Sequence, residues 1–541
     1  MAILARGVES GKVIFVLILN GNMGTSMDPV ELNIFASRLE AVCDEMGAVL
    51  RNAAFSPNIR DRLDYSCAVF DAQGELCAQA AHIPVHLGSM AFAMAGIVSS
   101  LEWQAGDMVV LNDPYLGGTH LPDVTLIAPL FADGELTAFV VNRAHHADIG
   151  AESPGSMPLS SSLEQEGRVI PPDYLLRGGE LNQRLYRSLV EENRNPQESA
   201  GDFAAQISAN RSGVERLSLM IDEWGRAGFL SGLQALNDYA EKLALNAIAA
   251  LPDGAYRFED LMDDDGQGSL DIPIRVCLTM RGGRVTVDFN GTAGQVAGNI
   301  NAPLSVAAAA VFYAFRCLMP PQTPACAGTF RPISLNAPVG CLLNAQRPAA
   351  VAAGNVETST RVVDVVLGAL AQVVPELIPA ASHGSMNNLA MGSDTPGRRW
   401  DYYETIGGGM GAGCRSPGQS GVQTHMTNTL NTPIEVVEGR FPLRIRRYEL
   451  RRGSGGAGRH GGGDGLRREF EFLAPVQVSL LTERRRRGPW GADGGGAGAA
   501  GRNLLDGEEL SGKVSLKLEA GQRLIIETPG GGGWGTPSSD E

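Results

Sequence analysis

Long hydrophobic runs are missing from this chain of 541 residues, which nowhere contains 18 consecutive apolar residues. A membrane-spanning helix needs about 20 such residues, so we predict no membrane segment. The run Val13–Leu19 follows Arg6 and Lys12, but it is short for a signal-peptide core, and no small-x-small cleavage pattern clearly follows it. Because Met27 opens a good helix start, we interpret residues 1–26 as a poorly ordered extension.

An excess of basic charge and a regular cysteine pattern are also missing. The sequence has 44 Lys and Arg against 60 Asp and Glu, a formal net charge of -16. Nucleic acids bind basic surfaces, so we expect no nucleic-acid partner. The eight cysteines are scattered without a C-x-x-C pair. Such scatter argues against a disulfide framework or a zinc-thiolate site and is typical of a cytoplasmic protein.

A credible phosphate-binding loop is missing as well. Residues 507–513 imitate a Walker A loop, but Val514 stands where Ser or Thr would hold magnesium, and a strand is expected to follow. The glycine-rich stretch 402–413 could let backbone N–H groups cradle an anion, or it could be a packed turn. It lacks the strand and helix context of a dinucleotide site. The chain therefore offers no convincing ATP site of its own.

Histidine, by contrast, is concentrated in one region. Five of the eight histidines fall within residues 82–146. Imidazole nitrogen together with carboxylate oxygen suits a divalent ion such as Zn, Mn or Fe. The alternative is that backbone groups satisfy these side chains in ordinary loops. The five are His82, His86, His120, His145 and His146.

The spacing around these histidines permits a single metal site. His120 and Asp123 are three residues apart, and Pro122 disfavours a helix through them, so we expect both on a turn with convergent side chains. The apolar runs 124–130 and 136–141 predict a β-hairpin.

The far end of that hairpin carries His145 and His146, and pairing of its strands would return these residues to the side of His120. Asp64 precedes a second predicted hairpin. Its carboxylate could join the cluster or merely cap a turn.

Periodicity predicts the α+β class, as a large, multi-lobed mixed α/β protein with a β-rich C-terminal domain. We expect a metal-bearing N-terminal lobe over 27–251, a central mixed lobe with glycine-rich loops over 252–440, and the β-rich domain over 441–541. A long ordered loop is expected over 154–177. Expected helices span 30–54, 91–101, 197–225, 228–251, 305–318 and 357–374. Expected strands include 67–71, 76–80, 108–111, 272–280, 284–290, 450–460, 463–472, 476–481, 514–518 and 524–528.

Seven motifs closely resemble the hydantoinase B / 5-oxoprolinase family, and the resemblance runs from about Met27 to about Pro537. One small departure is Ala151, which stands where a glycine is usual in that family. The motifs are Asn112–Asp123, Arg143–Gly150, Pro154–Pro158, Gly354–Thr358, Tyr403–Gly413, His425–Pro433 and Thr528–Gly535.

The resemblance implies a metal held by two histidines and two aspartates. His120, Asp123 and His145 match the family's ligand spacing, and Asp64 is the best match for the second aspartate. Asp61 competes with Asp64, and His146 competes with His145. The resemblance also implies that ATP is handled by a partner, a hydantoinase A-type subunit, in a hetero-oligomer.

Our hypothesis is a metal-bearing B subunit of an ATP-dependent cyclic amide hydrolase, which opens a hydantoin, 5-oxoproline or lactam ring. Water activated by the ion would attack the ring carbonyl, with His120, Asp123 and His145 as the catalytic residues. One alternative is a subunit of an ATP-dependent ketone carboxylase, and another is a non-catalytic scaffold for the A subunit. Further residues considered for substrate contact are His146, Asn387, Glu404 and His425.

Overall fold

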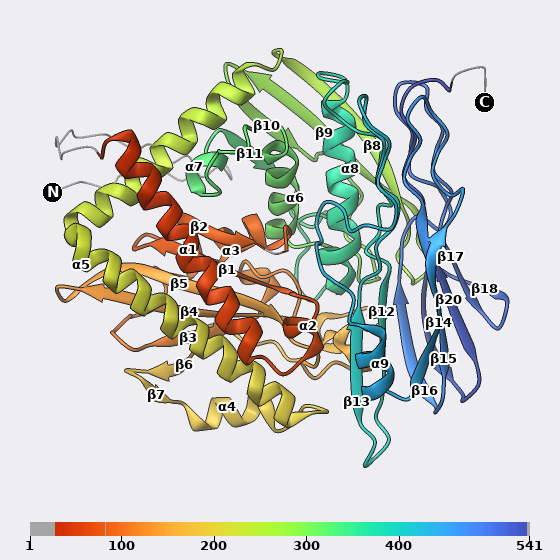
Figure 1. Ribbon diagram of the computed structural model, residues 1–541, viewed down its shortest axis with the longest axis horizontal. Coiled ribbons are helices and arrows are strands. Elements are labelled where there is room, and N and C mark those ends of the chain that lie inside the picture. Colours follow the sequence, from red (N-terminus) through yellow and green to blue (C-terminus); the bar gives the residue numbers. More distant parts are fainter. Residues whose placement is uncertain (1–26, 82, 538–541) are drawn as a thin grey trace.

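The computed structural model describes residues 27–81 and 83–537, so the expected extension 1–26 lies outside the described residues. Within them the chain forms four sheets of seven, four, four and five strands. Figure 1 shows the seven-stranded sheet behind two long helices, and the C-terminal strands as a separate layer at the opposite side of the molecule. The predicted mixed α+β architecture with a β-rich C-terminal part is confirmed.

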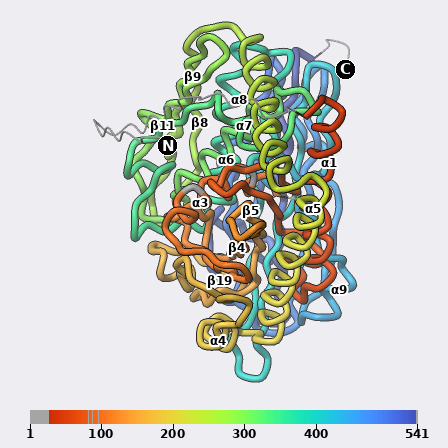
Figure 2. The backbone as a smooth tube through the Cα atoms, turned by 90° about the vertical axis from the view of Figure 1, so that its left-hand side faces the viewer, coloured from red at the N-terminus to blue at the C-terminus, as the bar shows by residue number. Residues whose placement is uncertain are grey.

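The first helix, α1 (Pro29–Ala53), forms where the periodicity predicted it. Asp28 caps it by accepting hydrogen bonds from the backbone N–H groups of Val30 (2.8 Å) and Glu31 (2.9 Å), which would otherwise lack partners. Its buried stripe shares a core with α5 (Pro196–Ala249), and Figure 2 shows the two helices side by side. The two helices expected at 197–225 and 228–251 are the two halves of α5, because Gly225 interrupts it with φ 67° and ψ 155°.

The seven-stranded sheet has the order β2-β1-β5-β4-β3-β6-β7, and all of its neighbouring strands are antiparallel. Alternate side chains of β1 enter different cores: Val69 packs with residues of α1 and α5, whereas Phe70 packs with Met94 of α3 (His86–Ile97). The sheet is therefore buried on both faces. The strands are β1 (Tyr65–Asp71), β2 (Leu76–Ala81), β3 (Met108–Leu111), β4 (Asp123–Ala132), β5 (Glu135–His145), β6 (Asp173–Arg177) and β7 (Glu180–Leu181).

Three of the expected segments need correction. The loop expected over 154–177 contains 3-10 turns at Pro154–Ser156 and Leu163–Glu166, and it ends in β6, which pairs with β3. The helix expected at 91–101 is α3, which begins at His86 and ends at Ile97. The helix expected at 357–374 is α8 (Ser359–Leu370), which follows a π-helical turn at Gly354–Thr358.

A second core lies between a four-stranded sheet and two helices. The sheet has the order β11-β10-β9-β8, and α6 (Leu304–Arg316) and α8 pack in the same core. The sequence pattern did not lead us to predict its strand β8 (Gly254–Asp264). The other strands are β9 (Leu270–Arg281), β10 (Arg284–Asp288) and β11 (Ile333–Asn336).

Two further sheets form the C-terminal layer, in the orders β13-β12-β16-β19 and β14-β15-β20-β17-β18. Strands from before and after residue 440 thus share one sheet. The strand expected at 450–460 is wrong, because β14 ends at Arg451. The Walker-like stretch 507–513 was predicted to be a turn, but only Gly507 belongs to the turn between β17 and β18, the stretch includes β18 itself, and the expected strand follows it as β19. The strands are β12 (Asn388–Ser393), β13 (Trp400–Glu404), β14 (Leu443–Arg451), β15 (Gly465–Phe472), β16 (Val476–Leu481), β17 (Arg502–Leu505), β18 (Glu508–Leu510), β19 (Lys513–Leu518) and β20 (Arg523–Glu527).

Glycine-rich segments pack backbone against backbone beside these sheets. The N–H groups of Gly408 and Gly409 donate to the carbonyl oxygens of Val422 (2.9 Å) and Pro529 (3.0 Å). A Cβ atom on Gly409 would lie 1.9 Å from the carbonyl oxygen of Gly463. Since these N–H groups are already hydrogen-bonded, the packed-turn interpretation of stretch 402–413 is favoured over an anion cradle.

The remaining helices are short: α2 (Pro57–Arg60), α4 (Gln183–Val190), α7 (Ala327–Phe330) and α9 (Ile434–Arg440). Across the described part of the chain, no helix combines the length and apolarity that crossing a bilayer would require.

Candidate metal centre

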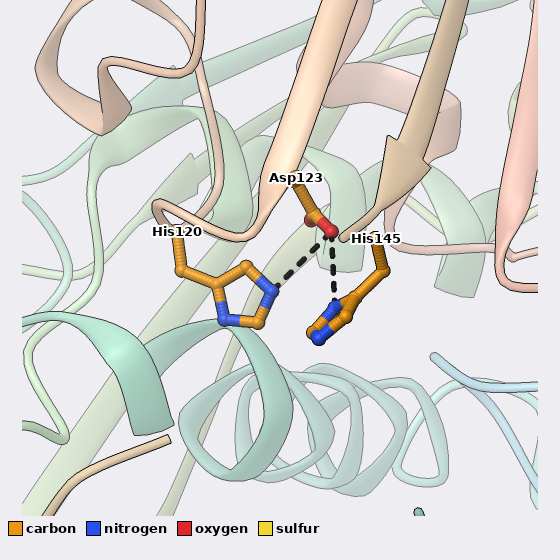
Figure 3. Close-up of side chains that lie close together, drawn as sticks. All are labelled: His120, Asp123 and His145. Carbon is orange, nitrogen blue, oxygen red and sulfur yellow. Dashed lines mark ion pairs between the residues drawn. The ribbon is translucent and has the colours of Figure 1, made fainter. Parts of the chain in front are cut away.

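The β4–β5 hairpin brings two of the predicted site residues together. Asp123 begins β4, His145 ends β5, and the strand register pairs these two residues. Paired residues of antiparallel strands project to the same face of the sheet. His120 lies on the turn before β4, where its carbonyl oxygen accepts a hydrogen bond from the Asp123 N–H at 3.1 Å. Figure 3 shows the three side chains converging from the turn and from the two strand ends.

One carboxylate oxygen of Asp123 faces both imidazoles. Asp123 Oδ1 lies 3.3 Å from His120 Nε2 and 3.3 Å from His145 Nδ1. The possible ligand atoms of the three residues all lie within 4.8 Å of one another, and the side chains are buried. Asp64 Oδ2 lies 3.9 Å from His145 Nδ1. All four residues line one cavity of about 20 Å³.

The two competing candidates lie elsewhere. Asp61 is hydrogen-bonded to its neighbour Arg60 at 2.9 Å and does not line the cavity. His146 follows His145 and projects to the opposite side of the sheet, where its Nε2 lies 2.9 Å from Gln206 Oε1. Among the clustered histidines, His82 falls outside the described residues.

The second oxygen of Asp123 is held by groups that sequence reasoning did not assign to the site. Asp123 Oδ2 accepts a hydrogen bond from the Thr119 hydroxyl and one from Asn355 Nδ2 at 3.4 Å. His86 Nε2 lies 3.3 Å from the same oxygen, and His86 Nδ1 lies 3.0 Å from the Ser66 hydroxyl. The available signals were the position of His86 among the clustered histidines and that of Asn355 in the motif 354–358.

The hydrogen bond of His120 determines which of its nitrogens faces the site. Nδ1 lies 3.1 Å from the Ala352 carbonyl oxygen. A carbonyl can only accept a hydrogen bond, so Nδ1 carries the proton in the neutral ring and Nε2 keeps its lone pair. In the described structure, the buried Nε2 atoms of His120 and His145 have no hydrogen-bond partner. A cation beside Asp123 Oδ1 would satisfy the lone pair of His120 Nε2, and His145 faces the same oxygen through Nδ1, so these residues fit a metal.

The local electrostatics favour the protonation state that a metal requires at Asp123 and at His145, but not at His120. Although burial opposes ionisation, His120 and His86 hold the pKa of Asp123 well below its usual range. Burial lowers the pKa of His145, an effect that Asp123 only partly offsets. For His120 burial also acts to lower the pKa, but Asp123 prevails and raises it. A metal would have to displace any proton on His120.

The ring of His145 is supported from outside the N-terminal region. It stacks on the Tyr403 ring with centroids 4.8 Å apart and planes at 9°. The Tyr403 hydroxyl donates to Asn388 Oδ1 at 2.7 Å, and the Asn388 amide donates to Glu357 Oε1 at 2.6 Å. The guanidinium of Arg62 lies 4.9 Å from the centre of the Tyr403 ring. This arrangement orients the ring of His145.

The other residues considered for substrate contact do not line the cavity. Glu404 forms an ion pair with Arg468 at 3.1 Å, because alternate residues of β13 face opposite sides and Tyr403 takes the side of the cavity. Asn387 donates to the Ile406 carbonyl oxygen at 2.9 Å.

His425 is likewise separate from the cavity, with its Nδ1 3.4 Å from the Tyr313 hydroxyl. The structure therefore groups Asp64, His120, Asp123 and His145 and separates the four substrate candidates from them.

Comparisons with known proteins point to one family. A family model described as Hydantoinase B/oxoprolinase matches residues 28–537. An uncharacterised protein of Methanocaldococcus jannaschii is 40% identical over 521 residues, which cover 94% of this chain and 91% of that protein. The 5-oxoprolinase 1 of Arabidopsis thaliana is 39% identical over 94% of this chain, but the chain spans only 42% of that relative's length.

Two solved structures have a similar fold. The crystal structure of ATP-dependent caprolactamase from Pseudomonas jessenii superposes with a TM-score of 0.88 at 28% identity, over 94% of this chain and 91% of that one. A nucleotide-free acetone carboxylase gives a TM-score of 0.85 at 18% identity, over 95% and 76% of the two chains, a likeness of fold alone. With a family model matched over nearly its whole length, the chain belongs to the hydantoinase B/oxoprolinase family.

Proposed function

We propose that this chain is the metal-bearing subunit of an ATP-dependent enzyme that hydrolyses cyclic amides. Membership of the hydantoinase B/oxoprolinase family supports the reaction class, as do relatives named 5-oxoprolinase and caprolactamase. The observation that carries the proposal is the position of Asp123 Oδ1, 3.3 Å from a nitrogen of each of two buried histidines.

The proposed ligands are His120 through Nε2, Asp123 through Oδ1, His145 through a ring nitrogen, and Asp64 as the second carboxylate. A divalent ion of the Zn, Mn or Fe type would supply a Lewis acid that polarises a carbonyl and lowers the pKa of a bound water to about 7. The chain's own contribution is positioning. Thr119, Asn355 and His86 all contact Asp123 Oδ2, so Oδ1 is left to face the ion.

The cavity also restricts when a substrate can enter. Its volume of about 20 Å³ is enough for one ion or one water, which needs roughly 10–15 Å³, and is too small for an amide ring. The form that binds substrate must therefore be more open. Once closed, the same buried walls would exclude bulk water from the reacting ring.

We assign ATP to a hydantoinase A-type partner in a hetero-oligomer. The match covers 42% of Arabidopsis 5-oxoprolinase 1, so more than half of that relative lies outside it. The Walker-like stretch at 507–513 supports this assignment, since it contains strand β18 and leads into strand β19 and not into a helix.

A ketone carboxylase subunit is the second candidate. The acetone carboxylase fold supports it, but the sequence identity is 18%, against 28% for caprolactamase. The amide hydrolase is therefore the better supported of the two. The third candidate, a non-catalytic scaffold for the A-type subunit, would contain no stoichiometric metal.

The test is to purify the chain with an A-type partner, to measure its metal content, and to assay ATP-dependent loss of 5-oxoproline, a hydantoin, caprolactam, and acetone with bicarbonate. We expect turnover of a cyclic amide and about one metal per site. His120→Ala should lose metal and activity but keep its fold, whereas the control His146→Ala should keep its metal. Full activity in metal-depleted His120→Ala would refute the proposal, and turnover of acetone alone would favour the carboxylase.

A further inference from the structure

A buried carboxyl group lies behind His120, outside the proposed ligand set. Glu166 ends the 3-10 turn Leu163–Glu166, and its side chain is fully buried. It accepts hydrogen bonds from the N–H of Val351 (2.9 and 3.1 Å), the N–H of Ala352 (2.9 Å) and the hydroxyl of Ser160 (2.7 Å). These are neutral donors. Among the ion pairs of the described residues, none involves Glu166.

The same backbone segment holds His120. The N–H of Ala352 donates to Glu166, and the carbonyl oxygen of Ala352 accepts from His120 Nδ1 at 3.1 Å. Residues 349–353 are four alanines and a valine, whose own side chains cannot make hydrogen bonds. Polar groups from elsewhere must therefore fix the position of this carbonyl oxygen. The Glu166 side chain provides such groups at two consecutive peptide N–H groups.

The geometry points to Glu166 as a positioning residue for His120: it holds the segment Val351–Ala352 so that the Ala352 carbonyl orients the imidazole with Nε2 toward Asp123 Oδ1. This inference rests on the proposed function, in which His120 Nε2 is a metal ligand. Groups that hydrogen-bond to a ligating histidine fix the ring's orientation and its tautomer. Here the fixing group is a backbone carbonyl, and Glu166 acts one hydrogen bond further from the ring.

A purely structural role would predict something different. In that case Glu166 would join the turn 163–166 to residues 351–352, and its removal would lower stability without changing how folded protein binds an ion. Asn299 provides a matched control. Its buried amide donates to the Pro158 carbonyl oxygen at 2.7 Å, so it anchors the same loop, but its side chain makes no hydrogen bond to Val351 or Ala352.

The first experiment measures zinc affinity of the purified full-length chain by competition with a chromogenic chelator. We expect folded Glu166→Ala to bind zinc about 10- to 100-fold more weakly than the natural protein. Asn299→Ala should lose stability but keep its zinc affinity. If Glu166→Ala does not fold, Glu166→Gln replaces it. That variant keeps one acceptor oxygen but places an amide N–H₂ near the Val351 N–H, and we expect its affinity to fall by at least about threefold.

The second experiment does not depend on metal. In protein labelled with ¹⁵N-histidine, with the His120 signals assigned by their loss in His120→Ala, we expect His120 to be held as the Nδ1–H tautomer. This preference should weaken in the folded Glu166 variant and persist in Asn299→Ala. If the natural protein binds neither zinc, manganese nor iron, the proposed function fails, and this measurement alone decides the role of Glu166. Unchanged zinc affinity or an unchanged tautomer in the folded Glu166 variant would overturn the inference, as would an equal effect of Asn299→Ala.

Discussion

Asp64 and Asp61 are three residues apart, yet only Asp64 lines the cavity of the candidate metal centre. Asp64 lies between the buried Arg62, whose Nη2 is 3.8 Å away, and His145 at 3.9 Å. We expect Asp64→Asn to weaken zinc binding by about 1 to 2 orders of magnitude, because an amide is a poorer ligand than a carboxylate. Zinc titration of the folded variants measures this loss of affinity.

The control is Asp61→Asn, whose side chain contacts Arg60 near the surface. It should bind zinc like the natural protein. If the two variants lost affinity equally, the loss would come from local refolding of residues 61–64, and Asp64 would no longer be assigned as the fourth ligand.

Glu357 makes stability depend on pH in the neutral range. Burial, reinforced by the nearby charge of Glu483, raises the pKa of Glu357 from 4.5 to about 8. The folded state binds the proton of the Glu357 carboxyl more tightly than the unfolded state does. The stabilisation from Glu357 is therefore complete below pH 4.5 and is lost as the pH rises through about 8. A shift of this size corresponds to at most about 5 kcal/mol.

We therefore expect the unfolding free energy of Glu357→Gln to depend less on pH than that of the natural protein between about pH 4.5 and 8. The amide keeps an acceptor oxygen for Asn388 and for the Met386 N–H. Urea unfolding at several pH values gives the comparison, with exposed Glu376→Gln as the control. A parallel pH dependence in the natural protein and in Glu357→Gln would contradict the raised pKa.

At the scale of whole elements, the glycine-rich segments require glycine for packing more than for backbone flexibility. A Cβ atom added to Gly409 would lie 1.9 Å from the carbonyl oxygen of Gly463. Because backbone cannot move aside as a side chain can, Gly409→Ala should cost about 3 kcal/mol of unfolding free energy. Chemical denaturation measures this cost.

Gly413 provides the matched control in the same segment, since a Cβ there would meet nothing within 4 Å. We expect Gly413→Ala to change stability by less than about 1 kcal/mol. If Gly409→Ala were equally harmless, the close packing of residues 407–413 against 463 and 531 would be wrong.

At the scale of the whole molecule, the candidate metal centre joins distant parts of the chain. Its proposed ligands come from residues 64–145, whereas Asn355 and Tyr403, which also line the cavity, belong to later sheets and turns. A ligand that binds only the folded state stabilises it by mass action. We expect zinc at 100 times its dissociation constant to add about 2.7 kcal/mol of stability.

Thermal unfolding with zinc, and then with excess chelator, tests this expectation. The stabilisation should reverse with chelator and should be absent in His120→Ala. An equal upward shift in His120→Ala would mean that zinc stabilises the protein from another site.

The local sequence pattern was sufficient to predict much of the secondary structure of this molecule. The strands around 124–130 and 136–141 form the predicted hairpin, and the three-residue spacing of His120 and Asp123 places both at its open end. The apolar stripe from Phe35 to Leu50 forms α1. These features depend on neighbours within about ten residues, which a sequence displays directly.

Other features depended on contacts that sequence order does not display. Glu404 was considered for substrate contact, but the pleat of β13 directs its neighbour Tyr403 toward His145 instead. Glu166 lay in a stretch without helix or strand signals, and its partners Val351 and Ala352 are about 185 residues away. No local pattern predicts such pairs.

By itself, then, the sequence determined the candidate ligand types, the hairpin that carries two of them, the turn that carries a third, and the family, because spacing and motif are properties of the chain. Only the tertiary structure decided that Asp64 faces the cluster while Asp61 does not, that His145 rather than His146 turns inward, and that Glu166 and Tyr403 support the two imidazoles. Those choices depend on which side of a strand each residue takes and on what packs against it, and packing exists only once the chain has folded.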